Sequence, residues 1–272
     1  MKYVKRACSR QASGTAQTNG VSWRVIRFAT LLTVLVASVG CGTSNPSKDT
    51  LAQEEPAPEL IVTRTFLPVD EFGKDGVLLP YETSANPYGE QKGRIKKQSV
   101  AMYIDARRAF KAGDYEVATS KLNELLENDK ALSGPWVMLG DIALRSDDTS
   151  AAQAHFEKAI EVNPENVNAY LRLAKVLRIN GEFIASQNVY AETLGLWKDF
   201  PEAHLNLAIL YDIYLDKPML AQQHMEAYLF LNSKKDEKVA HWLQELRGRT
   251  GVAYSIEAGA GDNNLSMAGD VE

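Results

Sequence analysis

The chain has 272 residues, of which 45% are hydrophobic and 24% charged, so its composition is that of an ordinary globular protein with one or two domains. Six of the 30 basic residues lie in residues 1–40, which contain no acidic residue, so the other 24 stand against all 35 acidic residues in residues 41–272. This acidic body excludes nucleic acid as the main partner, because binding phosphate needs a basic surface.

The N-terminal part of the chain has the layout of a signal peptide. Arg24 and Arg27 precede an apolar run, residues 28–37, that is too short for a membrane-spanning helix. Small residues and then Cys41 follow, and this arrangement resembles a bacterial lipobox, although Ser38 replaces the usual Leu. The resemblance implies that the cysteine carries lipid. An uncleaved signal anchor and simple secretion stay open as alternatives.

Lipidation at Cys41 would remove residues 1–40 and place the mature chain on a membrane. Gly42 stands where an Asp would retain a lipoprotein in the inner membrane, so we expect the outer membrane, with the protein facing the periplasm. The acyl chains of a mature lipoprotein suffice for stable anchoring. Cys8 is lost with the leader, and no structural disulfide is therefore expected.

Residues 41–98 are expected to form a lipid-anchored and largely extended linker. Six prolines interrupt any helix in this range. Residues 60–62 and 76–81 are too apolar for a pure linker, so we expect these two pieces to pack on the first of the helical repeats that follow. The alternative is that they dock a partner or fill the protein's own groove.

Residues 99–249 carry a repeat with a period of 34 residues. Its clearest copy places aromatic, small and aliphatic residues at fixed spacing before a proline: Trp136, Leu139, Gly140, Ala143, Ala152, Phe156, Ala159 and Pro164. This spacing resembles the tetratricopeptide repeat, with Ala143 in place of the usual Tyr. Gly140 and Ala152 are small because the two helices of one hairpin cross closely there, while Phe156 packs inward.

The resemblance implies an all-α solenoid of about four tetratricopeptide-type helical hairpins. The copies span 99–132, 133–166, 167–200 and 201–235, and a capping helix over 236–249 covers the last apolar edge. Residues 250–272 are rich in Gly, Asn and acidic residues and are expected to be a disordered tail. We also expect Trp136, Phe156 and Tyr190 to share one continuous interior.

In solenoids of this kind the first helix of each repeat lines the concave face, where a partner binds. The residues expected in this groove mix apolar and basic side chains: Tyr103, Arg107, Lys111, Val137, Asp141, Arg145, Leu171, Lys175, Arg178, Leu205, Ile209 and Asp212. The mixture favours an extended or helical peptide with acidic and apolar residues. An ordinary solvated face would show the same mixture.

The sequence contains no catalytic or metal-binding motif that we can identify. His155, His204, His224 and His241 are scattered one per segment, without the spacing of metal ligands. Phosphate-binding loops and nucleophile elbows are missing as well. We therefore expect a protein that is not an enzyme and uses no cofactor, with His204 as a satisfied core histidine.

These features together favour a scaffold or adaptor, anchored in the outer membrane through Cys41, that docks a protein or peptide partner of an envelope assembly in the periplasm. One alternative is an assembly factor like the pilotins or the barrel-assembly lipoproteins, which resemble this chain in joining a lipid anchor to tetratricopeptide repeats. The other is an adaptor that delivers substrates to a periplasmic enzyme.

Overall fold

The computed structural model describes residues 59–256, apart from residue 70 and residues 233–235. The predicted signal peptide, Cys41 and residues 257–272 lie outside the described residues. Within the described part, a 3-10 helix over Arg64–Phe66 precedes these α-helices: α1 (Pro87–Glu90), α2 (Lys97–Ala112), α3 (Tyr115–Asn128), α4 (Ser133–Arg145), α5 (Thr149–Val162), α6 (Val167–Ile179), α7 (Phe183–Leu196), α8 (Pro201–Ile213), α9 (Pro218–Leu231) and α10 (Glu237–Thr250). None of these helices is both long and apolar enough to cross a bilayer.

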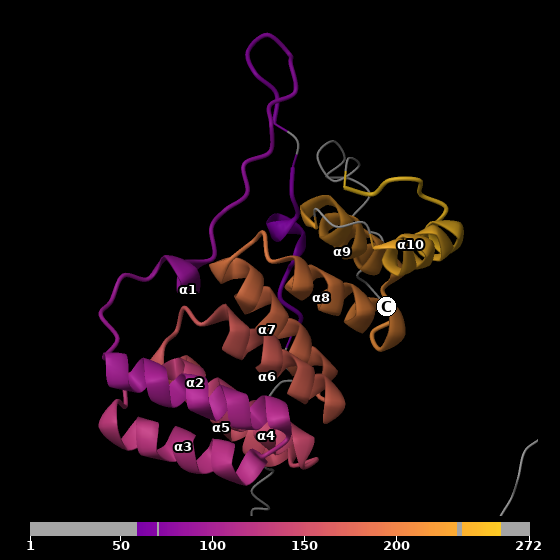
Figure 1. Ribbon diagram of the computed structural model, residues 1–272. Helices are drawn as coiled ribbons and strands as arrows, with labels where there is room; N and C mark the ends of the chain where they lie inside the picture. The colour runs from indigo at the N-terminus through magenta and orange to yellow at the C-terminus, as the bar shows by residue number, and fades with distance from the viewer. Residues whose placement is uncertain (1–58, 70, 233–235, 257–272) are drawn as a thin grey trace, which may run out of the picture. The chain divides into compact units, whose positions relative to one another are not determined.

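The helices from α2 to α9 pair as four successive antiparallel hairpins, and α10 packs on α9 (Figure 1). Gly113 and Gly181 follow the first helix of their hairpins with φ of 82° and 84°, a left-handed conformation that glycine adopts without strain. Pro218 begins α9, where its missing N–H costs no hydrogen bond. The prediction of an all-α array of helical hairpins is confirmed.

The crossing of α4 and α5 explains the glycine of the clearest repeat. A Cβ atom built on Gly140 would lie 2.4 Å from Cε1 of Phe156, so no larger residue fits without a shift of the ring. Phe156 and Ala152 are completely buried at this crossing. The two small residues therefore let the helices approach closely enough to enclose the phenylalanine ring.

The buried side chains group into three clusters, which differs from the expected single interior. Trp136 packs against the cluster between α2, α3 and α4, Phe156 belongs to a second cluster, and Tyr190 belongs to a third that extends to α10. Helix α4 contributes residues to the first two clusters, and Val189 packs against the last two. Each hairpin thus buries most of its apolar face against the neighbouring hairpins, as in other repeat arrays, and Phe66 and Tyr88 add to the cluster that contains Tyr190.

Helix α10 lies where the capping helix was expected, with Val239, Leu243 and Leu246 buried. The residues after it differ from the prediction of a disordered tail beginning at 250. Glu226 of α9 is 3% exposed, and its carboxylate accepts hydrogen bonds from Ser255 Oγ at 2.8 Å and from two backbone N–H groups of residues 255–256. Arg247 of α10 pairs with the same carboxylate at 3.2 Å. A buried acceptor therefore fixes the first residues of the tail.

Ending the chain after Gly251 is expected to lower the free energy of unfolding by about 1–3 kcal/mol. The truncation removes three of the donors to the buried Glu226 carboxylate. Leaving a buried acceptor without partners lowers the free energy of unfolding by roughly this amount. Urea titration followed by circular dichroism measures the change. Ending the chain after Ile256 is the matched control, and equal losses in the two truncations would contradict this role of Glu226.

The sequence predicted that residues 60–62 pack on the first repeat. In the structure, residues 59–69 pack instead on the third and fourth repeats. The backbone N–H of Ile61 donates to Asn188 Oδ1 at 2.9 Å, and its carbonyl accepts from Gln187 Nε2 at 2.8 Å. Phe66 packs against the cluster that contains α7, α8 and α9 residues. Glutamine and asparagine on α7 thus satisfy an extended backbone much as a neighbouring strand would.

Residues 81–96 continue along the loops that join successive hairpins. The Asp199 carboxylate, in the α7–α8 loop, accepts from Tyr81 Oη at 2.5 Å and from the N–H and hydroxyl of Ser84 at 2.6 Å. Burial by itself would raise the pKa of Asp199, but the hydrogen bonds from Ser84 and Tyr81 outweigh it and lower the pKa. Further along, Gln91 and Asn163 exchange two hydrogen bonds. We call residues 59–69 and 81–96 the strap.

A chain of buried hydrogen bonds joins the strap to the last hairpin. His204 Nε2 lies 2.8 Å from the Lys198 carbonyl, His204 Nδ1 lies 2.9 Å from His224 Nδ1, and His224 Nε2 lies 2.8 Å from Thr63 Oγ1. Thr63 Oγ1 in turn lies 3.0 Å from Tyr211 Oη. Because a carbonyl only accepts, His204 must carry its proton on Nε2, which makes its Nδ1 the acceptor and His224 Nδ1 the donor. Both histidines are neutral in this arrangement.

Candidate functional site

The candidate site is the face formed by the first helices of the hairpins, α2, α4, α6 and α8, which we call the first-helix face. Helix α2 contacts α4, and α6 contacts α8. Arg172 of α6 donates through Nε to both carboxylate oxygens of Asp141 on α4, at 2.8 and 3.0 Å. Arg178 donates a hydrogen bond through Nη1 to the hydroxyl of Tyr214, just beyond α8, at 3.2 Å. These contacts fix the spacing between neighbouring hairpins.

Three cations follow one another along α6 at intervals of one turn. Lys175 is half-buried between Arg172 and Arg178, and among the described residues it makes no hydrogen bond or ion pair. Burial is the largest cause that lowers the pKa of Lys175, and the two arginines lower it further. Asp141 pairs with Arg172, and Glu202 and Asp141 both raise the pKa of Lys175, partly offsetting the other causes. Three cations against these two carboxylates leave the patch with a net positive charge that an acidic ligand would compensate.

Two of the twelve residues expected in the groove are not available to a partner. Leu171 is 7% exposed because its side chain belongs to the buried cluster against which Tyr88 packs. The side chain of Asp212 is 7% exposed, since Trp242 and Arg249 of α10 donate to its two oxygens. The other ten lie on the expected helices and are half-buried or exposed: Tyr103, Arg107, Lys111, Val137, Asp141, Arg145, Lys175, Arg178, Leu205 and Ile209.

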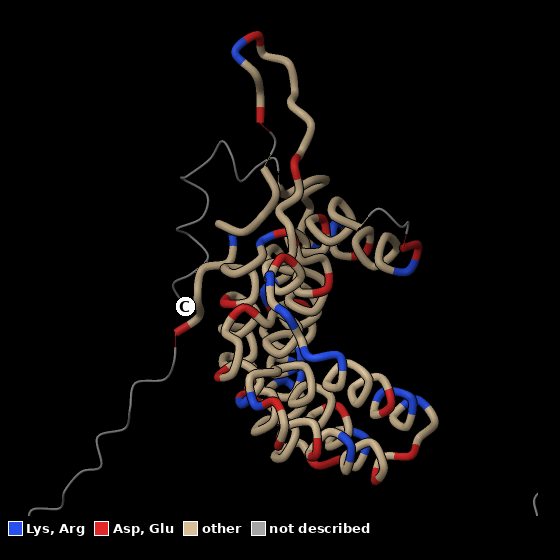
Figure 2. The backbone as a smooth tube through the Cα atoms, turned by 60° about the vertical axis from the view of Figure 1, so that its left-hand side comes forward, with Lys and Arg blue, Asp and Glu red and all other residues tan. Residues whose placement is uncertain are grey.

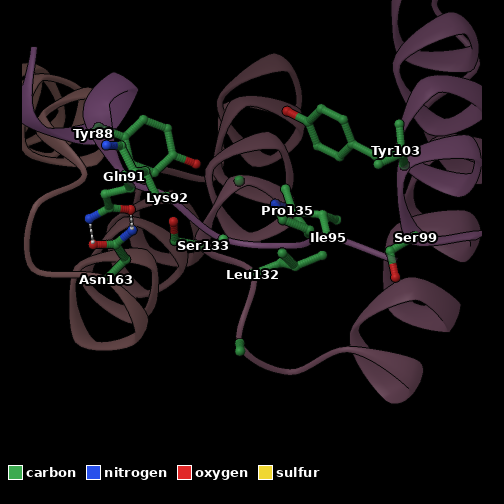
Figure 3. Close-up of a pocket in the computed structure, with 14 residues that line it drawn as sticks. Tyr88, Gln91, Lys92, Ile95, Ser99, Tyr103, Leu132, Ser133, Pro135 and Asn163 are labelled. Carbon is green, nitrogen blue, oxygen red and sulfur yellow. Dashed lines mark hydrogen bonds between the residues drawn. The ribbon is translucent and has the colours of Figure 1, made fainter. Parts of the chain in front are cut away.

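A pocket of about 840 Å³ lies where the chain passes from α1 into α2, and it shares Tyr103 with the first-helix face (Figure 3). Tyr88 of α1 and Tyr103 of α2 point toward one another across it, as Figure 3 shows. Apolar side chains form much of its lining, among them Ile95, Val100, Leu132 and Pro135. This pocket could not be predicted from the sequence, because residues of the strap, α2 and the α3–α4 loop meet only in the folded chain.

The described residues contain no cluster of three or more side chains that would hold a metal ion. The four histidines are scattered along the sequence, but the fold brings two of them together. His204 and His224 stand 20 residues apart in the sequence, yet the α8–α9 hairpin stacks their rings at a centroid distance of 5.1 Å. Their partners are the chain's own groups, so the pair belongs to the core.

A scan against protein-family models matches residues 137–183 to the tetratricopeptide repeat, a segment that runs from α4 to the first residue of α7. A curated relative, the peroxisomal targeting signal receptor of Debaryomyces hansenii, is 28% identical over 184 residues. The alignment covers 62% of this chain and 30% of the receptor, so the chain spans less than a third of that relative's length.

Solved structures share the arrangement of helices. The MamA RS-1 ArsTM double mutant aligns with a TM-score of 0.50 and 17% identity over 61% of this chain and 91% of that chain. MamA 41-end from Desulfovibrio magneticus RS-1 aligns at 0.49 and 17%, over 61% and 92%. At this identity the likeness concerns the fold alone. Together with the family match over residues 137–183 and the array of hairpins, it shows that the chain contains a tetratricopeptide repeat within a tetratricopeptide-type fold.

Proposed function

We propose that the protein is a scaffold for protein–protein interactions, without catalytic activity, whose first-helix face binds a peptide or protein segment that presents acidic and apolar side chains. The observation that carries the proposal is Lys175, half-buried between two arginines, which makes no hydrogen bond or close ion pair among the described residues although Glu202 and Asp141 act on it from a distance. Leu205 and Ile209 on α8 supply partly exposed apolar surface beside this patch. Repeat arrays generally use such extended faces to hold partners.

The comparison with the curated relative supports the same proposal. That protein is named as a receptor for a targeting signal, and the part that resembles this chain accounts for 30% of its length. A repeat array that recognises a protein segment would be consistent with that name. The identity of the segment bound here is set by the side chains on the first-helix face, which mix cations with aliphatic residues.

Changing Arg107 and Lys175 together to Glu is expected to reduce partner capture about tenfold or more, since an acidic ligand would meet like charge in place of opposite charge. Folding should survive, because Glu at position 175 would lie between two arginines. The measurement is quantitative mass spectrometry of proteins that co-purify with the full-length chain from its own cells.

The matched control changes Lys121 on α3 and Lys238 on α10 to Glu, with the same change in net charge outside the first-helix face. This control should retain the partner. A partner retained equally by both double variants, or lost equally from both, would count against the first-helix face.

We also propose that the chain is a lipoprotein, attached through Cys41 to the outer membrane and facing the periplasm, where it serves an envelope assembly. The basic flank, the apolar run 28–37 and the cysteine after small residues support this location. Metabolic labelling with an alkyne fatty acid should mark the wild-type chain and leave a Cys41→Ser variant unmarked. Equal labelling of both chains, or of neither, would refute the anchor.

A further inference from the structure

Residues 71–80 form a hairpin that stands clear of the helices in both views (Figure 1, Figure 2). Phe72 and Leu78 pair in an antiparallel bridge, and the N–H of Gly73 donates to the carbonyl of Val77 at 2.8 Å. The turn closes through Gly76, whose φ of 73° favours glycine. The element is thus a tight hairpin closed by one antiparallel bridge, which we call the ribbon.

Both faces of this ribbon are apolar and exposed to solvent. Phe72 is 64% and Leu78 53% exposed, and as a directly opposed pair they lie on one face. Val77 is 60% and Leu79 45% exposed, and alternation places them on the other face. Gathered apolar side chains on a protruding element are typical of a surface that another molecule covers.

The hairpin is fixed at both ends to the last two repeats. Pro68 is buried at one root, while at the other Tyr81 packs edge-to-face on Phe230 of α9, with ring centroids 5.1 Å apart, and donates to Asp199. The pocket between α1, α2 and the start of α4 involves none of these anchoring elements. Because the two ends of the hairpin are fixed at α9 and the α7–α8 loop, the hairpin cannot bend back into the pocket of its own chain.

The charges of the hairpin and of the pocket rim are complementary. The hairpin carries Glu71 and Asp75 against Lys74, a net charge of one negative. The rim is formed by Lys92, which lines the pocket, and by the neighbouring strap residues Arg94 and Lys96. Two acidic groups beside the pocket lining, Glu165 and Asp129, accept hydrogen bonds from Gln91 and Ser99. An acidic apolar ribbon therefore matches an apolar pocket with a basic rim.

We propose that this pocket binds the apolar hairpin of a second copy of the chain. Phe72 and Leu78 enter between Tyr88 and Tyr103, and Glu71 and Asp75 face the basic rim. The contact joins different surfaces of the two copies, so it is head-to-tail and leaves one hairpin and one pocket free at the ends of each assembly. This goes beyond the proposed function and uses a surface other than the patch on α6.

The test is sedimentation velocity on the full-length chain across a series of concentrations. The wild type should grow in mass with concentration, whereas Phe72→Ser/Leu78→Ser and Lys92→Glu/Arg94→Glu should each stay monomeric, with self-association weakened about tenfold or more. An equimolar mixture of the two variants should form dimers and nothing larger, because one intact pocket then meets one intact hairpin. Dimers alone in the mixture are diagnostic of head-to-tail binding.

Val117→Ser/Ile179→Ser is the matched control, since both residues are exposed aliphatic side chains outside the hairpin and the pocket. It should associate like the wild type, as should Lys175→Glu on α6, so a failure of self-association is distinguished from a failure of the proposed function. A wild type that stays monomeric at every concentration, a mixture that does not associate, or hairpin-dependent binding of the monomer to phosphatidylcholine vesicles would overturn the proposal.

Discussion

Replacing Phe156 by Ala is expected to lower the free energy of unfolding by about 3–5 kcal/mol, because the ring is completely buried and its removal leaves a cavity between α4 and α5. Gly140→Ala should cost about 1–3 kcal/mol for the opposite reason, since the new methyl group would overlap the same ring. Urea unfolding followed by circular dichroism measures both.

The double variant Gly140→Ala/Phe156→Leu tests whether these losses come from the close packing of the two residues or from a general sensitivity of α4 and α5 to substitution. The smaller leucine should accommodate the added methyl group, so the double variant should lose less stability than the sum of its two single variants. Gly134→Ala, in the same helix, is the matched control: a Cβ there meets its nearest atom at 3.6 Å, an ordinary contact, and stability should hold. Additive losses would show that Gly140 and Phe156 do not share this constraint.

Acidification is expected to destabilise the fold between about pH 6.5 and pH 4 through the buried histidine pair. Burial lowers the pKa of His204 from 6.5 to about 4, and burial and the neighbouring ring lower the pKa of His224 well below its ordinary value. The unfolded chain therefore binds protons that the folded chain excludes. Stability is complete above pH 6.5 and falls as the pH drops, by about 3 kcal/mol from His204 alone at the lower limit.

Replacing His204 by Gln separates this effect from the titration of carboxylates. The variant should be less stable than the wild type at neutral pH, because the hydrogen bond to His224 Nδ1 is perturbed. Its loss of stability between pH 6.5 and pH 4 should be smaller, since one titrating group is gone. Urea unfolding at successive pH values measures both changes, with His241→Gln, an exposed histidine, as the control. An unchanged acid response in His204→Gln would contradict the neutral pair.

The helical hairpins could be predicted from the sequence because their packing is local and periodic. Gly140 and Phe156 occupy slots set by the spacing within one repeat, and the structure brings them into contact at the distance that excludes a Cβ. The same spacing placed His204 in a buried slot, and it is fully buried. The four hairpins bury their apolar faces against sequence neighbours, so a fixed period carries enough information to place them.

The strap, the hairpin and the pocket could not be placed in the same way. Thr63 meets His224 across 161 positions of sequence, and no periodic pattern relates an extended segment to the helices it contacts. The partners of the strap are polar side chains of α7 and of the inter-hairpin loops, such as Gln187 and Asp199, which look like ordinary surface residues in the sequence. The position of residues 252–256 likewise depends on a polar side chain, Glu226, that looks like an ordinary surface residue in the sequence.

One feature of the sequence does indicate the hairpin. The turn residues 73–76, Gly-Lys-Asp-Gly, separate Phe72 from Val77, and a short glycine-containing loop between apolar residues is typical of a β-hairpin.

The 34-residue period placed the predicted groove residues on the correct helices. The period does not reveal that α10 covers Asp212 or that Leu171 belongs to the core, because both depend on contacts outside the repeat.

The most direct test of the account is photo-crosslinking in the protein's own cells, with a photoreactive amino acid placed at Arg145 or Ile209 on the first-helix face, or at Val117 on α3. The account predicts that the two first-helix positions crosslink the same protein and that Val117 does not, with the adducts lost when Arg107 and Lys175 are changed to Glu. Adducts from Val117 alone, or adducts that persist in the charge-reversed variant, would contradict the claim that this face binds the partner.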